Sequence, residues 1–553
     1  MIDRGVRRRG VAALLLAAAA WVQPAAAQVP DGRSAPVLRP SLPAETPAGA
    51  LDNAAVPTLT TLDAAIARAY WTNPTLIAER ATLKSVDPLF AQARASYGPQ
   101  LSLQASHLFA RDRREVLPGL FSRPEGFSST AQLIFSQPLL PFGRLAAAEQ
   151  GALAQIALSR EELRLSEAST MFGVVSAYVS VVRDRAILDF ARQNLALLER
   201  QYSESRERFA VRDITSSDLQ QVETRLAFGR AQLLNAQGAL GSSQSLFLQF
   251  TGGLPGELAV PAPISLGVPT LDAAYAVAET ASPIVRGAQA REKVSRAAVA
   301  AARAQRNPEV SLQASGLYGP SNLYQNQLRS TELRSSVVVN LPIIDSGIRR
   351  TAIERARQAN EADWRLVDAA LRETRQSVAE AWDGYRSALE SLEHYRAAAA
   401  AAQAAYDGAV IQERAGDRTT LDVLDLARDL LNVRTSFATA EANEYLSRAR
   451  LLGAMGNLEA PKLVPGIAAY DPTANFQRVR RKGDVPLLTP LVSGIDQAIG
   501  GALRDDRPSG EDRPIRDPSA GLRNESAVIP IPPSPAPTTR IPPPPGTSPE
   551  RRR

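Results

Sequence analysis

The sequence has no cysteine and very little histidine, and this excludes several kinds of site. It has no cysteine among its 553 residues, which excludes structural disulfides, thiol catalysis and cysteine-ligated zinc. Its only histidines, His107 and His394, lie far apart in the chain. A metal centre or a histidine-based catalytic pair is therefore not expected, and both histidines are predicted to be ordinary polar surface residues.

Signals for nucleotide and nucleic-acid binding are also missing. No Gly-rich phosphate loop of the P-loop kind occurs. The net charge of +6 is small for this length, much of it lies at the two ends, and no basic stripe with interleaved aromatics is present. The sequence therefore predicts no enzyme, no cofactor and no nucleic-acid partner.

Long hydrophobic runs are rare as well. The apolar stretch Val11–Val22 follows a positive segment with Arg7 to Arg9 and precedes Ala25–Ala27, a small-residue cleavage site, so residues 1–27 are predicted to be a signal peptide. It is shorter than the ~20 residues of a spanning helix. No later segment has 18 uncharged apolar residues in a row. Any membrane-embedded part is therefore expected to consist of β-strands.

The chain contains an internal repeat. Thr61–Ala65 recurs as Thr270–Ala274, 209 positions later, and Ala91–Ser106 matches Ala300–Ser315 at the same shift with ten of sixteen residues identical. Later pairs, such as Asp218 and Asp422, keep a shift of 204. A repeat of this length is too long for a solenoid unit, so we predict a two-fold duplication of a whole domain, with a surface loop absorbing the difference.

Each half is predicted to hold a helix, two strands and two long helices. The first helix, 62–96, is rich in Ala, Leu and Arg and stops at Gly98-Pro99. Alternation of apolar and small polar residues then predicts paired strands near 101–106 with 130–135, and 310–315 with 335–339. Polar loops at about 111–125 and 319–329 are predicted to join them. A hairpin in a soluble sandwich would give the same alternation, but two hairpins are too few for one, which favours a barrel shared between subunits.

The long helices show a seven-residue period. Apolar residues recur in the first half from Val174 to Phe209, and in the second half from Val378 to Tyr406, where Glu413 then breaks the series. Such a period is typical of supercoiled helices. The predicted segments are a signal peptide (1–27), a Pro- and Ala-rich leader (28–57), the first repeat (58–252), a linker (253–269), the second repeat (270–457) and a Pro-rich, disordered periplasmic tail (458–553).

Three local motifs carry a family resemblance. Gln137–Arg144 and Leu341–Gly347 resemble the Pro-Leu-aromatic-x-Gly-Gly junction of TolC-type outer-membrane efflux proteins, although the first lacks one glycine. Gly416–Asp425 (GDRTTLDVLD) closely resembles the tip of that family's inner helical hairpin. The order of elements matches over roughly residues 58–457, and the chain is identified as a member of this family.

The resemblance implies a fold class that is mainly α with a small β part. Three subunits would each give four strands to one twelve-stranded barrel in outer-membrane lipid, and their long helices would form a tapered α-barrel in the periplasm. It also implies a homotrimer working as an exit duct with a periplasmic adaptor and an inner-membrane pump, driven by protons or by ATP. The cargo is left open between small toxic molecules and polypeptides.

The resemblance also implies a periplasmic gate. The family's closing Arg and two Asp residues fall on Arg418, Asp422 and Asp425, and Asp218 takes the place of the partner of that Arg. Rings of carboxylates around a threefold axis would attract cations and narrow a pore. The alternative is that Asp218 and Asp422 only cap helices after the turns. A family tyrosine would fall on Glu413, so one closing hydrogen bond is predicted to be absent.

A second function remains to be weighed against the duct. The signal peptide, the seven-residue period and the hairpins are also consistent with a scaffold or adhesin without a pore. Such a protein would be a coiled coil in the periplasm or at the cell surface. A barrel protein needs detergent for solubility and a scaffold does not, so solubility separates the two.

Overall fold

The computed structural model describes residues 56–502. The chain divides into two compact units, Met1–Val56 and Pro57–Arg553. The predicted signal peptide, almost all of the predicted leader and residues 503–553 lie outside the described residues. The description below concerns the second unit.

Three short helices replace the single predicted helix of the first half. They are α2 (Leu62–Thr72), α3 (Pro74–Val86) and α4 (Pro88–Ala95). Each break falls before a proline, because the residue before proline disfavours helical backbone angles. Asn73 strengthens the first break by accepting hydrogen bonds from the N–H groups of the next helix. The second half has the equivalent break between α7 (Leu271–Ala281) and α8 (Pro283–Ala304).

The predicted strands form one four-stranded antiparallel sheet. Its strands are β2 (Gln100–Arg111), β5 (Glu125–Leu140), β7 (Glu309–Asn322) and β8 (Gln325–Asn340), in the order β2-β5-β7-β8. The two predicted hairpins, β2–β5 and β7–β8, therefore form one sheet because β5 pairs with β7. A separate short parallel pair, β1 (Thr58–Leu59) with β6 (Leu254–Pro255), ties the linker to the start of the first half.

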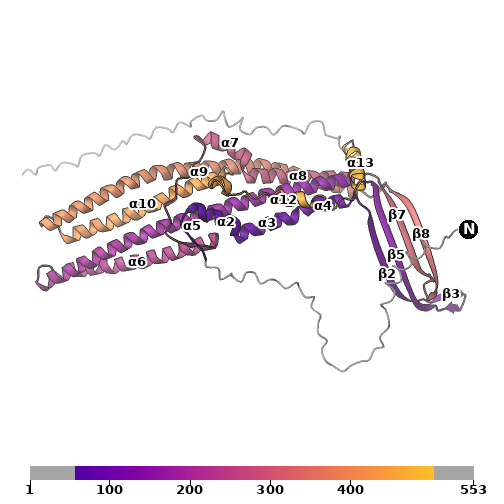
Figure 1. Cartoon of the computed structure of the whole chain (residues 1–553), viewed down its shortest axis with the longest axis horizontal. Helices are drawn as coiled ribbons and strands as arrows, with labels where there is room; N and C mark the ends of the chain where they lie inside the picture. Colours follow the sequence, from indigo (N-terminus) through magenta and orange to yellow (C-terminus); the bar gives the residue numbers. More distant parts are fainter. Residues whose placement is uncertain (1–55, 503–553) are drawn as a thin grey trace, which may run out of the picture. The chain divides into compact units, whose positions relative to one another are not determined.

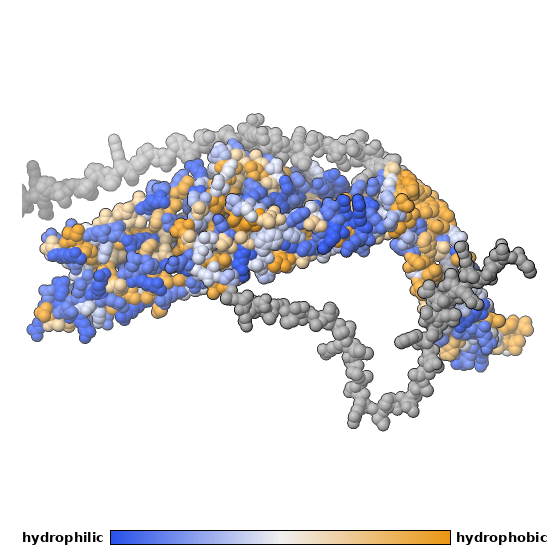
Figure 2. Space-filling model, in the orientation of Figure 1, coloured by the Kyte–Doolittle hydropathy of each residue, from blue (hydrophilic) through white to orange (hydrophobic). Residues whose placement is uncertain are grey.

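One face of the four-stranded sheet is apolar. The register pairs Leu101 with Phe135 and Leu103 with Leu133, and paired residues lie on the same face. The opposite face carries small polar residues such as Ser106 and Thr130, whose hydroxyls are 2.7 Å apart. Many apolar side chains of the first face are exposed, and Figure 2 shows hydrophobic colouring spread over these strands. The sheet therefore presents to its surroundings the kind of surface that proteins usually bury.

The connections between the strands differ from the predicted loops. Residues 111–125 contain a small hairpin of their own, β3 (Arg114–Leu117) with β4 (Leu120–Ser122). The predicted loop 319–329 is mostly strand, because β7 and β8 continue to a tight turn at residues 323–324. Polar residues there continue the ladder because cross-strand hydrogen bonding does not require apolar side chains.

Two long helical hairpins are the largest units of the described chain (Figure 1). The first is α5 (Arg144–Ala210) with α6 (Ser216–Thr251), and the second is α9 (Ile348–Ala415) with α10 (Thr420–Ala454). Helices α5 and α10 pack against each other and so join the hairpins. The heptad residues Val174, Val181 and Val378 are fully buried, as the period predicts.

The main core lies where both hairpins meet α2, α3 and α7. Tyr70, Met171, Tyr178 and Phe247 are among its fully buried side chains. Helix α5 contains a window apolar enough to cross a membrane by composition, and 44% of that window is buried within the protein. Packing inside the helical part thus accounts for somewhat less than half of this window.

The predicted disordered tail is wrong for residues 458–502. This segment folds into α11 (Ala460–Leu463), α12 (Ala474–Val479) and α13 (Leu488–Ala502) and packs back on the helical part. Tyr470 stacks on the guanidinium of Arg80, 4.8 Å from the ring centroid. The average composition of 458–553 concealed this segment because residues 503–553 are rich in Pro and Arg, whereas 20 of the 45 residues from 458 to 502 are apolar. In the helices these apolar residues are spaced so that one side can be buried.

Candidate functional site

The two hairpin tips have the same local structure. Thr215 and Thr419 are the N-caps of α6 and α10, and each hydroxyl accepts a hydrogen bond from the N–H three residues later. The carboxylates of Asp218 and Asp422 reach back to the cap N–H groups at 3.0 and 3.2 Å. Both tips are therefore closed by reciprocal capping boxes, which satisfy otherwise unpaired helix donors.

This arrangement gives the two predicted gate carboxylates a structural role. The hydroxyl of Thr215 donates to Asp218 at 2.8 Å and holds the pKa of Asp218 below its ordinary value. Thr419 makes the same contact with Asp422. Within one chain, Asp218 and Asp422 therefore act as helix caps, as the alternative interpretation predicted. The cap leaves Asp422 exposed and Asp218 partly exposed, so both carboxylates can still face charges outside the chain.

Asp425 joins the two hairpins. Its carboxylate accepts a hydrogen bond from Arg225 of α6 at 2.8 Å, and Arg428 lies 3.7 Å away. The hydrogen bond from Arg225 holds the pKa of Asp425 below its ordinary value, and the positive charges of Arg225 and Arg428 act in the same direction. Sequence reasoning missed Arg225. It lies seven residues after Asp218 and so on nearly the same face of α6, but this spacing does not identify Asp425 as its partner.

The partner predicted for Arg418 is Asp218 on a neighbouring hairpin. Arg418 is exposed at the tip of the second hairpin and, among residues 56–502, it makes no hydrogen bond or ion pair. The structure does not bring it to Asp218 within one chain. Glu413, which stands where the family has tyrosine, instead accepts a hydrogen bond from the hydroxyl of Thr420 at 2.9 Å. Arg208 of α5 donates weakly to the same hydroxyl at 3.4 Å, a second link between the hairpins that the sequence did not indicate.

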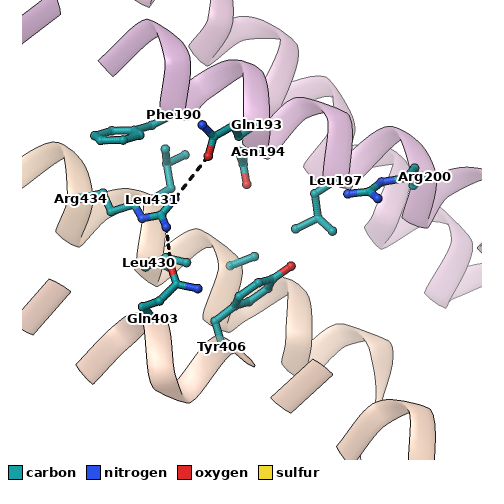
Figure 3. Close-up of a pocket in the computed structure, with 11 residues that line it drawn as sticks. Phe190, Gln193, Asn194, Leu197, Arg200, Gln403, Tyr406, Leu430, Leu431 and Arg434 are labelled. Carbon is teal, nitrogen blue, oxygen red and sulfur yellow. Dashed lines mark hydrogen bonds between the residues drawn. The ribbon is translucent and has the colours of Figure 1, made fainter. Parts of the chain in front are cut away.

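A cavity of about 240 Å³ lies between the hairpins, farther from the tips (Figure 3). Arg434 reaches across it and donates to the side-chain oxygens of Gln193 on α5 and Gln403 on α9. A larger cavity, of about 470 Å³, lies closer to the tips and includes Arg225 and the exposed ring of Phe228. Contacts between the hairpins are thus partly polar and incompletely packed, which suits surfaces that slide past each other.

No group of three or more metal-binding side chains occurs in the part of the chain that the structure describes. The tip instead concentrates carboxylates, hydroxyls and arginines. Such an arrangement can bind counter-ions and link neighbouring helices, and it contains no recognisable catalytic constellation.

Comparison with known proteins agrees with this geometry. The family model described as outer membrane efflux protein matches twice, over residues 65–253 and 274–457. The outer membrane efflux protein BepC of Brucella suis biovar 1 is 28% identical over 423 residues, which are 76% of this chain and 91% of BepC. The outer membrane protein TolC of Escherichia coli K12 is 21% identical over 71% of this chain and 81% of TolC.

Solved structures show the same fold. The Campylobacter jejuni CmeC outer membrane channel superposes with a TM-score of 0.63 at 14% identity, covering 77% of this chain and 90% of that channel. The open state of the Neisseria gonorrhoeae MtrE outer membrane channel gives 0.57 at 19% identity, covering 72% and 90%. The predicted family, the outer-membrane location and the duct role are confirmed: this chain belongs to the outer membrane efflux protein family, as an efflux channel of the outer membrane.

Proposed function

We propose that three copies of this chain assemble into one channel whose sheets close into a twelve-stranded barrel in outer-membrane lipid. The observation that carries this proposal is the four-stranded sheet with an apolar face and two open edges, β2 and β8. Open edges and unpaired backbone groups are not tolerated in hydrocarbon, so the edges need partners. Copies of the same sheet supply them: β8 of one subunit would pair with β2 of the next. The two family matches further support an origin of the two halves by duplication.

The helical part is proposed to extend the channel through the periplasm. Helices of 67 and 68 residues span roughly 100 Å at about 1.5 Å per residue. We propose that a periplasmic adaptor and an inner-membrane pump engage this part, because efflux relatives belong to pump systems by name and the sequence has no P-loop motif. The pump would supply the energy and this chain the passive exit path. A poreless scaffold is less well supported, because it would leave the apolar sheet face without a function.

Assembly can be tested directly. The purified protein should run as a trimer in detergent and conduct ions in planar bilayers. A cysteine pair that bridges β2 of one copy to β8 of another, for example at Leu103 and Val337, should give covalent trimers on oxidation. The chain has no cysteine of its own, so the background is clean. A monodisperse monomer that conducts ions would contradict the proposal.

The gate is proposed to work at two levels. Within a subunit, Arg225–Asp425 links the hairpins across α6 and α10. Between subunits, the free guanidinium of Arg418 is proposed to reach Asp218 of a neighbouring copy, since a planar guanidinium fits a carboxylate bidentately. Around the threefold axis, Asp422 and Asp425 would form carboxylate rings that attract cations. Opening would require these links to break together.

Single-channel recording tests the gate. Arg418→Ser should raise conductance by removing the link between subunits, and Arg225→Ser should raise it by freeing one hairpin from the other. The exposed Arg206, which has no ion pair among the described residues, provides the matched control Arg206→Ser. Asp422→Ala with Asp425→Ala should weaken cation selectivity and abolish block by multivalent cations from the periplasmic side. Unchanged conductance in both arginine variants would show that closure resides elsewhere.

Small toxic molecules are the cargo that the relatives favour. One relative in Pseudomonas putida is described as a toluene efflux pump protein, and another as an antibiotic efflux pump protein. Polypeptide export is the second candidate for this chain. A deletion strain should become sensitive to solvents and antibiotics while its set of secreted proteins stays unchanged. Loss of a secreted protein without increased sensitivity would reverse this choice.

A further inference from the structure

Helix α13 has one face that is firmly held by the rest of the chain. The side chains of Thr489, Val492 and Asp496 on this face are buried. Asp496 accepts hydrogen bonds from the N–H groups of Gly143 and Ala146 at 2.5 and 2.8 Å. The helix is therefore fixed in rotation about its own axis, and its opposite face must point away from the protein.

That opposite face is apolar and carries no charge. Leu491 and Ile495 lie four residues apart on this face and are 61% and 37% exposed, and Leu487, directly before the helix, is 88% exposed. Asp496, which is buried, is the only charged residue between 485 and 502. Water-facing helices normally carry charges on their exposed side, and a contiguous apolar stripe marks a surface that binds something.

The stripe lies next to the end of the apolar sheet face. Gln137 of β5 is on the same face as Leu133 and Phe135, by the two-residue period of a strand. Its side-chain amide donates to the carbonyl oxygen of Tyr97 at 2.8 Å, and the buried ring of Tyr97 packs with Val492 of α13. Helix α13 therefore covers the apolar face of the sheet where the strands end and the long helices begin.

We propose that α13 rests on the phospholipid surface at the periplasmic edge of the barrel, with Leu487, Leu491 and Ile495 in the boundary between headgroups and acyl chains. This inference rests on the proposed barrel, which places the apolar sheet face in lipid. The uncharged stripe then lies beside that surface. Interfacial helices usually need a polar face toward water, and here the protein replaces water on that side.

The proposal gives the C-terminal segment a function in positioning. Helix α13 is held by the strand-to-helix junction on one side and would contact lipid on the other. It would therefore set the depth of the channel in the membrane. Two other occupants are conceivable for an uncharged stripe: a neighbouring copy of this chain or the adaptor protein. Both would shield the stripe from lipid, which separates them from the proposal.

Tryptophan reporters test the contact with lipid. The full-length protein carrying Leu491→Trp is reconstituted into vesicles of phosphatidylcholine with brominated acyl chains, and its emission is compared with that of the parent protein. Leu487→Trp serves as a second reporter. Ile411→Trp is the matched control, because Ile411 is a similarly exposed apolar residue (67%) near the helical tip. Leu103→Trp reports insertion of the sheet itself.

We expect Leu491→Trp, Leu487→Trp and Leu103→Trp to lose most of their added emission in brominated lipid, and Ile411→Trp to lose none. Quenching at Leu103 without quenching at either α13 position would overturn this inference and leave the barrel intact. A blue-shifted but unquenched signal at α13 would point to a protein partner and would also overturn it. Absence of quenching at Leu103 would instead count against the proposed barrel.

Discussion

Replacing Asp496 by alanine should loosen the junction between β5 and α5. The first N–H groups of a helix have no partner inside the helix, and Asp496 supplies one for Ala146 from 350 positions away in the sequence. It also accepts a hydrogen bond from the buried hydroxyl of Tyr97 at 3.1 Å. Burial, followed by the charge of Asp496, raises the pKa of Tyr97, so this hydroxyl stays protonated and needs an acceptor.

The size of the effect follows from these contacts. Loss of a helix cap costs about 1 kcal/mol, and a buried hydroxyl left without a partner costs about 1–3 kcal/mol. The local opening free energy at residues 143–146 should therefore fall by about 2–4 kcal/mol. Since about 1.4 kcal/mol corresponds to a factor of ten, amide hydrogen exchange there should accelerate by roughly thirty-fold or more.

Hydrogen exchange with mass spectrometry on the detergent-solubilised protein measures this directly. Asp471→Ala is the matched control, because Asp471 lies in the same C-terminal segment, is exposed and accepts its hydrogen bonds from the nearby Thr473 and Ala474. The control should leave exchange at residues 143–146 unchanged. Equal exchange in Asp496→Ala and the parent protein would refute the reasoning, since it would mean that α13 does not hold this junction.

Four further outcomes are expected. Truncation after Leu463 should speed exchange at the start of α5 as Asp496→Ala does, whereas truncation after Ala502 should not; equal effects would show that α13 is dispensable. Tyr470→Ala should release 464–479 to limited proteolysis, because the ring covers the guanidinium of Arg80, while Tyr470→Phe should not. The Arg225–Asp425 link should be fully present above about pH 4, the ordinary range of Asp, and be lost as the pH falls through the lowered pKa of Asp425. Arg225→Gln should therefore remove the acid-induced part of any rise in conductance. Finally, a cysteine at Ser122, on the exposed β3–β4 hairpin, should react with an impermeant thiol reagent on intact cells if the strand connections face outward; labelling only after lysis would reverse the topology.

Local patterns in the chain predicted much of this architecture. The two-residue alternation located the strands and their apolar face, since side chains of a strand point to opposite sides wherever the strand pairs. The seven-residue period located the long helices and the buried residues Val174, Val181 and Val378. The tip motif Gly416–Asp425 pointed to the efflux family because a turn and its caps are built from neighbouring residues. Such features depend on short-range geometry, which can be predicted from the order of neighbouring residues.

Long-range packing settled the rest. Arg225 meets Asp425, and Asp496 caps α5, only because helices distant in sequence lie side by side in the folded chain. The C-terminal segment showed the same limit: its composition suggested a disordered tail, yet residues up to 502 find a surface on which a few apolar side chains and one buried carboxylate are enough to fold. A contact between remote residues gains its free energy from the whole surrounding structure. A local sequence pattern therefore does not predict which two residues will meet.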